Sequence, residues 1–138
     1  MTITWPDTLP VVQVRIARPT ARLDEVVAFY RDLIGLPELY RFVGHSGYDG
    51  VMLGLPGADY HLEFTSHEAG SPCPAPSEEN LLVLYFSGDS AMYDVVERFG
   101  EAGHEPVEAE NPYWNQVGAM TFEDPDGWRV VLVPRPVF

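Results

Sequence analysis

The sequence predicts an α+β protein of two tandem βαβββ modules, whose curved mixed sheets form a cup-shaped pocket. The first observation behind this prediction is an internal repeat: one constant shift along the chain places Gly35 on Gly103 and Gly50 on Gly118. The second observation is that strand and helix patterns follow in the same order in both halves. A repeat of half the chain indicates two copies of one supersecondary unit, and a pocket is expected where their sheets meet.

The first module is expected over residues 11–65, and it begins with a strand at 11–17, where β-branched residues alternate. A helix is predicted next, because Thr20 offers an N-cap oxygen and apolar residues recur at helical spacing until Gly35. Three further strands, separated by turn-forming residues, are expected near residues 38–43, 48–55 and 59–65.

The second module is expected over residues 80–134, after a linker at 66–79 that is rich in Pro, Ser and Glu. A strand at 81–86 precedes a helix, which Asp89 or Ser90 caps and which Gly100 or Gly103 ends. Strands near 104–109, 117–123 and 128–133 complete the module, the last two joined by the turn signal of residues 124–127.

The composition restricts the class of protein. With 138 residues, 46% of them hydrophobic, the chain fits one domain spanning residues 1–138. The formal net charge of −13 would repel a phosphate backbone, so we expect no nucleic-acid partner. No apolar run reaches the roughly 20 residues that span a bilayer, and residues 1–6 lack the pattern of a signal peptide. We therefore expect no membrane partner and a cytoplasmic location.

Two phrases add a family resemblance. The first is VAFYRDLIGL at residues 27–36, and the second is FEDPDGW at residues 122–128, just before the last strand. In register within paired βαβββ units, they resemble the vicinal oxygen chelate superfamily of glyoxalase I, extradiol dioxygenases, fosfomycin-resistance transferases and bleomycin-binding proteins. The resemblance covers residues 11–134 and implies the fold. It leaves the function open, because this fold serves isomerases, transferases, oxygenases and plain binding proteins.

The resemblance also raises the question of a metal. Enzymes of this superfamily hold one divalent cation with His or Gln on the first strand of each module and a carboxylate on the last. In the first module, Gln13 and Glu63 match, and His61 lies on the same strand face as Glu63. In the second module the match fails. Residues 80–86 carry no imidazole or amide within the strand body, and Val131 stands at the position equivalent to Glu63. We therefore favour no resident cofactor, with a divalent metal on Gln13, His61 and Glu63 as the alternative.

Glu63 needs an explanation of its own, because a carboxylate inside an apolar strand is costly to bury unless it is paired, bound to metal or protonated. An ion pair with Arg15 of the first strand is the simpler expectation. In the alternative, Glu63 and His61 are candidate catalytic residues that exchange a proton with a bound ligand.

Aromatic residues indicate a ligand at the mouth of the cup. Tyr113 and Trp114 precede a strand of the second module, and His45 and Tyr48 occupy the corresponding place in the first. Rigid rings at such positions offer stacking area to a flat or apolar ligand. The candidate ligand-binding residues are Trp114, Tyr48, Tyr113, His45, Arg15, Tyr85 and Asn115.

The favoured function is binding of a small, aromatic or largely apolar organic molecule, as in sequestering proteins of the antibiotic-resistance type. The alternative is a metal-dependent lyase, isomerase or dioxygenase of the glyoxalase type. A homodimer is expected, because each sheet needs its concave face covered. The sequence leaves open the identity of the ligand, whether any reaction is catalysed, and whether the modules pair within one chain or between two.

Overall fold

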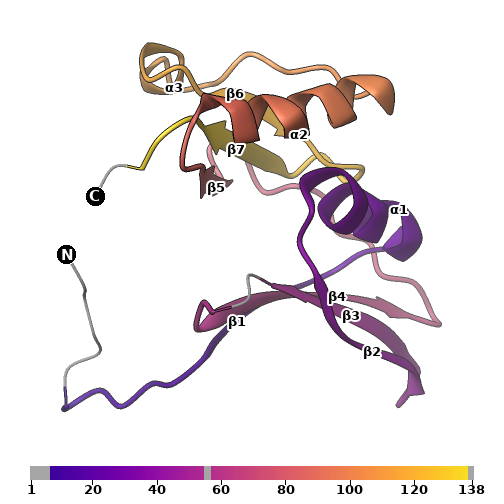
Figure 1. Cartoon of the computed structure of the whole chain (residues 1–138). Coiled ribbons are helices and arrows are strands. Elements are labelled where there is room, and N and C mark those ends of the chain that lie inside the picture. The colour runs from indigo at the N-terminus through magenta and orange to yellow at the C-terminus, as the bar shows by residue number, and fades with distance from the viewer. Residues whose placement is uncertain (1–6, 55–56, 137–138) are drawn as a thin grey trace.

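The computed structural model describes residues 7–54 and 57–136, and it consists of two modules, each with a sheet and helices (Figure 1). The first module contains β1 (Val14–Pro19), α1 (Leu23–Val27), η1 (Ala28–Ile34), β2 (Glu38–His45), β3 (Tyr48–Gly54) and β4 (Tyr60–His67). The second contains β5 (Leu81–Tyr85), α2 (Asp89–Glu101), α3 (Tyr113–Gln116), β6 (Met120–Glu123) and β7 (Arg129–Val133). The predicted α+β class is confirmed.

Both sheets have the same mixed order, as the internal repeat predicts. The first sheet runs β1-β4-β3-β2 and the second β5-β7-β6, with the first strand of each module parallel to the last and the other pairs antiparallel. Residues 1–6, which were predicted to lack a signal-peptide pattern, and Leu55, the end of the strand predicted at 48–55, lie outside the described residues. Within the described ranges, no helix is long and apolar enough to cross a membrane.

The strand predicted near 104–109 was wrong. This segment makes a single bridge, Val107 to Thr121, and so it adds no strand to the second sheet among the described residues. Pro106 within it has no backbone N–H to donate to a ladder, which limits pairing to one residue. A short helix, α3, forms at residues 113–116, which carried no helical signal of their own.

The helix boundaries differ in detail from the predicted caps. Thr20 Oγ1 accepts a hydrogen bond from the backbone N–H of Arg22, so it caps the loop before α1, and Arg22 holds the N-cap position. The N-cap of α2 is Gly88, and neither Asp89 nor Ser90 makes a side-chain cap. The first helix widens into the π-helical segment η1 before it ends, as predicted, at Gly35 with φ of 105°.

One core joins the two modules. The helical segments pack on each other through Phe29 and Phe99, whose stacked rings lie 4.8 Å apart. Tyr30 of η1 stacks on Phe64 of β4, and Phe99 of α2 packs on Phe122 of β6. Each helix therefore covers one face of its own sheet, and both covered faces belong to one hydrophobic cluster (Figure 1).

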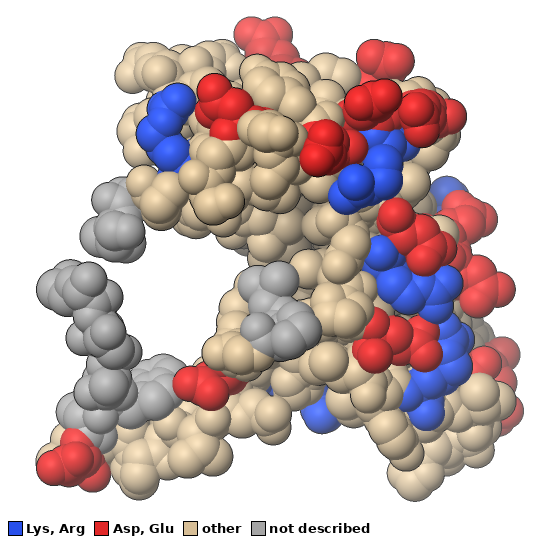
Figure 2. Space-filling model, in the orientation of Figure 1, with Lys and Arg blue, Asp and Glu red and all other residues tan. Residues whose placement is uncertain are grey.

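The other face of each sheet lies away from α1, η1 and α2 and points away from this shared core. We call this face the first face in the sheet of β1 to β4 and the second face in the sheet of β5 to β7. The helix-covered faces of the two sheets meet at the centre of the folded molecule. The first and second faces therefore do not close over each other within one chain. Acidic side chains spread over both modules with arginines between them (Figure 2).

Candidate ligand-binding site

The first face collects several of the predicted site residues. The register pairs Arg15 of β1 with His61 of β4, and Met52 of β3 with Glu63 of β4. Because side chains alternate along a strand, all four point to the same side. The same alternation brings further side chains to this face, namely Tyr40, Phe42, Tyr48 and His67.

Arg15 forms the centre of the first face. Its Nε donates a hydrogen bond to Nε2 of His61 at 2.9 Å, and its Nη1 lies 3.5 Å from Oε2 of Glu63. Nη2 contacts the sulfur of Met52 at 3.5 Å. The Glu63 side chain is only 12% exposed, and the expected ion pair with Arg15 offsets the cost of burying its carboxylate.

These residues do not fit a divalent metal. A cation would need the lone pair of His61 Nε2 and the carboxylate of Glu63 as donors. The lone pair already accepts a hydrogen bond from Arg15, and the carboxylate lies beside the Arg15 guanidinium. Gln13 is exposed and precedes β1, which begins at Val14. Over residues 7–54 and 57–136, no three His, Cys, Asp or Glu side chains gather as a metal site.

An aromatic surface borders the Arg15 centre, and its nearest members, Phe42 and Tyr40, were not among the predicted site residues. Phe42 lies across Gly50, where an added Cβ would sit 2.2 Å from the ring. Tyr40, opposite Met52, is 60% exposed. The available signal was Gly50 itself, because a glycine inside a strand indicates the close approach of another group.

The predicted loop aromatics of the first module lie further along the same face. The ring of Tyr48 packs edge-on against His67 with centroids 4.6 Å apart. His45 packs edge-on against Phe42 at 6.1 Å. Both therefore border the far end of the first face and do not contact Arg15.

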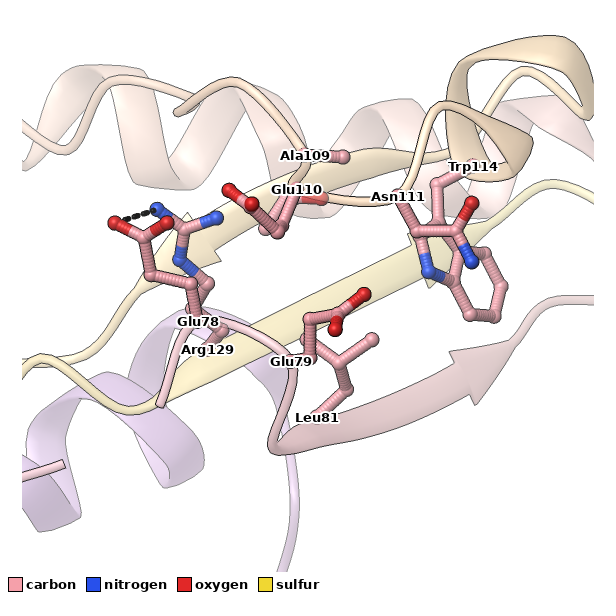
Figure 3. A pocket seen from close by; sticks show the side chains of 9 residues that line it. Glu78, Glu79, Leu81, Ala109, Glu110, Asn111, Trp114 and Arg129 are labelled. Atoms are coloured by element: carbon pink, nitrogen blue, oxygen red, sulfur yellow. Dashed lines mark ion pairs between the residues drawn. The ribbon is translucent and has the colours of Figure 1, made fainter. Parts of the chain in front are cut away.

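Trp114 lies on the second face. With Leu81, Thr121 and Arg129 it lines a hollow of about 150 Å³, and three glutamates, Glu78, Glu79 and Glu110, stand around it (Figure 3). A hydrogen bond with Glu78, and the repulsion between the two carboxylates, raise the pKa of Glu110 above 4.5. Arg129 is buried and pairs with Glu123 and Glu78.

The remaining predicted ligand residues are scattered. Tyr113 packs edge-on against Trp114 but is 43% exposed, and neither it nor Asn115 lines the hollow of the second face. Tyr85, at the end of β5, lines a separate hollow together with Tyr60 and Phe86. The structure therefore places Arg15 and Trp114, with their neighbours, on two different sheets, and one ligand can contact both only if the two faces are brought together.

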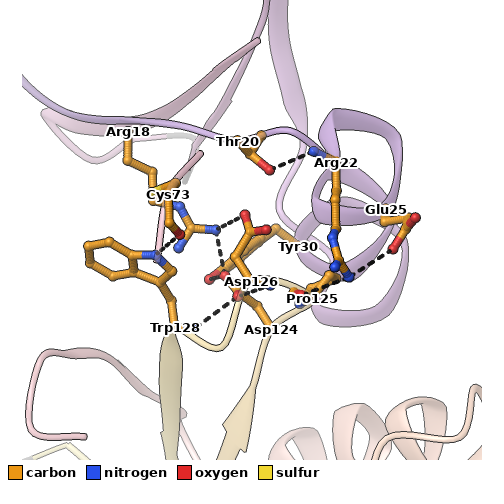
Figure 4. A network of polar contacts seen from close by, with 10 residues as sticks. All are labelled: Arg18, Thr20, Arg22, Glu25, Tyr30, Cys73, Asp124, Pro125, Asp126 and Trp128. Carbon is orange, nitrogen blue, oxygen red and sulfur yellow. Dashed lines mark hydrogen bonds and ion pairs between the residues drawn. The ribbon is translucent and has the colours of Figure 1, made fainter. Parts of the chain in front are cut away.

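A third polar group, shown in Figure 4, joins the modules. Arg18 of β1 lies between the rings of Phe64 and Trp128, with its guanidinium carbon 5.0 and 4.8 Å from their centroids. It donates to the buried Asp124, which precedes the last strand. Because these side chains are nearly all engaged with one another, this group acts as a joint between the modules.

The comparisons with known proteins agree with the two-module fold. Family models described as the YycE-like N-terminal domain and the YycE-like C-terminal domain match residues 14–65 and 79–134. The protein YycE of Bacillus subtilis (strain 168) is 49% identical over 121 residues, covering 88% of this chain and 86% of that protein. A crystal structure of a YycE protein from Bacillus subtilis matches with a TM-score of 0.90 and 44% identity over 98% of both chains.

More distant solved structures share the fold. Glyoxalase I of Leishmania major matches with a TM-score of 0.67 at 16% identity, over 87% of this chain and 84% of that one. TnmS3, an antibiotic binding protein from Streptomyces sp. CB03234, matches with a TM-score of 0.63 at 20% identity, over 93% and 98%. At such identities the likeness shows the fold and not the activity.

Proposed function

The chain belongs to the YycE-like family of the vicinal oxygen chelate superfamily, and we propose that it binds a small, aromatic or largely apolar organic molecule on the first face. The observation that carries this proposal is the composition of that face. Exposed rings and aliphatic groups surround a single polar centre, and that combination is typical of small-molecule sites. Tyr40 and Tyr48 are 60% and 43% exposed there. Leu39, which the irregular register of β2 brings beside Gly54 on the same face, is 52% exposed.

The proposed activity is sequestration, without turnover of the ligand. It is supported by the Arg15 guanidinium, which engages both polar side chains that could otherwise exchange a proton or hold a metal. TnmS3 shares this fold and is named an antibiotic binding protein, so the fold accommodates binding as a function.

We further propose that a second copy of the chain completes the site. The first face exposes its apolar side chains, and the second face, which carries Trp114, points elsewhere in the same chain. A two-fold pairing of the first face of each copy with the second face of the other would cover both and create two equivalent cups. In this arrangement, Arg15 and Trp114 of one site come from different copies.

The experiment is mass spectrometry of small molecules released from the purified protein, followed by titration of the folded protein with each of them. We expect an organic molecule that copurifies in a ratio of up to one molecule per chain. It should bind again when added back and be recovered chemically unchanged. Conversion of that molecule by the protein would contradict sequestration and favour a glyoxalase-type enzyme, with Glu63 and His61 the first residues to substitute.

A further inference from the structure

We propose that Arg15 is the resident cation of the first face and that it holds the ligand by a carboxylate group, in a site that uses no divalent metal. This inference rests on the proposed function, because it names the chemical class of the ligand for the same face.

The guanidinium is held at Nε and, more loosely, at Nη1. Nε donates to Nε2 of His61 at 2.9 Å, which requires a neutral imidazole with its proton on Nδ1. Nη1 lies beside the Glu63 carboxylate at 3.5 Å. The positive charge thus sits between an imidazole and a carboxylate, and a metal could reach those two donors only by displacing Arg15.

The Nη1–Nη2 edge of the guanidinium is available to a ligand. In the part of the chain that the structure describes, neither Nη group donates a hydrogen bond to a protein oxygen, and Nη2 has only the Met52 sulfur as a partner. The Arg15 side chain is 46% exposed. A planar guanidinium with two free N–H groups matches the two oxygens of a carboxylate, with parallel hydrogen bonds.

The surroundings favour a carboxylate with an apolar body. Met52 and Tyr40, which face each other across β2 and β3, lie next to the Arg15 centre. Among the described strand residues that alternate onto the first face, Glu63 is the single carboxylate, and it is already paired with Arg15. In a chain of net charge −13, the free guanidinium edge is therefore a local place for an anion.

The first experiment compares three probes of one shape: naphthalene-2-carboxylate, naphthalene-2-carboxamide and 2-(aminomethyl)naphthalene, titrated into the folded protein by calorimetry. We expect the carboxylate to bind at least tenfold more tightly than the other two. Carboxylate binding no tighter than amide binding would overturn the inference while leaving the proposed function intact. Absence of binding by all three would overturn both.

The second experiment assigns the preference to Arg15. Arg15→Met should weaken the carboxylate at least tenfold and leave the amide within about twofold, because only the carboxylate uses the charge. Arg22→Met is the matched control, since Arg22 is 57% exposed on the other side of the sheet at the start of α1, and it should change neither probe. Equal losses for carboxylate and amide in Arg15→Met would mean that Arg15 supports the fold of the face and would overturn the inference.

The third experiment tests the resident cation directly with Co²⁺, whose visible absorption reports its coordination. Arg15→His replaces the cation with a third donor beside His61 and Glu63, so this variant should bind Co²⁺ at least tenfold more tightly than the unaltered protein. Adding Glu63→Gln should remove the gain. About one divalent metal per unaltered chain, removable by EDTA with loss of naphthalene-2-carboxylate binding, would overturn the inference.

Discussion

Arg18 donates a hydrogen bond from Nη2 to Oδ2 of Asp124 at 2.6 Å, and this contact joins the first strand of one module to the turn before the last strand of the other. The Asp124 side chain has no exposed surface. Its carboxylate also accepts hydrogen bonds from the Tyr30 hydroxyl at 2.7 Å and from the backbone N–H of Trp128 at 3.0 Å. One carboxylate thereby connects a strand, a helix and a turn from the two modules.

Asp124→Ala should lower the free energy of unfolding by about 3–5 kcal/mol, because it leaves Arg18 buried without its main partner. Urea unfolding followed by circular dichroism measures this change. Asp89→Ala is the control, since Asp89 is 69% exposed and 4.0 Å from Arg135, and surface ion pairs contribute about 0–1 kcal/mol. A similar small loss in both variants would contradict the role of Asp124 as a joint.

Stability should fall at alkaline pH because of Tyr30. Burial, and then the negative charge of Asp124, hold the pKa of the Tyr30 phenol well above its ordinary value of 10.0. The unfolded chain releases this proton near pH 10 while the folded protein keeps it. The contribution of Tyr30 is therefore complete below pH 10 and is lost as the pH rises toward the pKa of the folded state, by up to about 1.4 kcal/mol per pH unit.

The measurement is the free energy of unfolding at several pH values on both sides of 10. Burial also raises the pKa of Tyr60, so that residue adds a second contribution of the same sign. Tyr30→Phe should reduce the alkaline slope, and Tyr60→Phe should reduce it less, since Tyr60 is only half-buried. An alkaline slope unchanged by Tyr30→Phe would refute this assignment.

Gly50→Ala should disturb the first face. A Cβ at this position would lie 2.2 Å from Cζ of Phe42, so the ring must move off the sheet, at a cost of about 1–3 kcal/mol for an overpacked site. Gly100→Ala is the matched substitution in open space within α2, and it should stabilise the protein by about 0.5–1 kcal/mol. Thermal unfolding of the two variants checks both signs, and a gain in stability for Gly50→Ala would show that Phe42 does not depend on the glycine.

Ligand affinity should depend on Trp114 more than on Gln13. Trp114→Ala removes an aromatic surface beside the hollow of the second face and should weaken binding by about 1–3 kcal/mol. Gln13→Ala should cost less, since Gln13 is exposed ahead of β1. Calorimetric titration with the copurified ligand decides between them. If Gln13→Ala abolished binding and Trp114→Ala did not, the second face would have no part in the site.

The protein should form a homodimer through the first face. Light scattering at micromolar concentration is expected to give twice the chain mass of 15.4 kDa. Tyr40→Glu places a charge among the exposed apolar groups of the first face and should shift the protein toward single chains. Tyr93→Glu, at a residue 55% exposed on α2, should leave the mass unchanged. The mass of one chain for the unaltered protein would refute the dimer.

Much of the fold follows from local patterns that the sequence displays. Turn-forming residues between extended segments predict β3 and β4, and helical spacing predicts α2, because these signals arise from backbone geometry within a few residues. The strand predicted near 104–109, which did not form, shows the limit of such local patterns. Its composition permits extension, but pairing depends on Thr121, which lies in another part of the chain.

The sequence by itself determined that the chain has two modules and that His61 and Glu63 share one strand face, because positions two apart on a strand point the same way. Only the tertiary structure decided that Arg15, and not Gln13, meets them, since the parallel register of β1 against β4 sets which residue lies opposite. It also decided that Trp114 belongs to the other sheet, with the helices packed between the covered faces. Register and module packing depend on contacts between residues far apart in the chain, and local periodicity carries no information about those contacts.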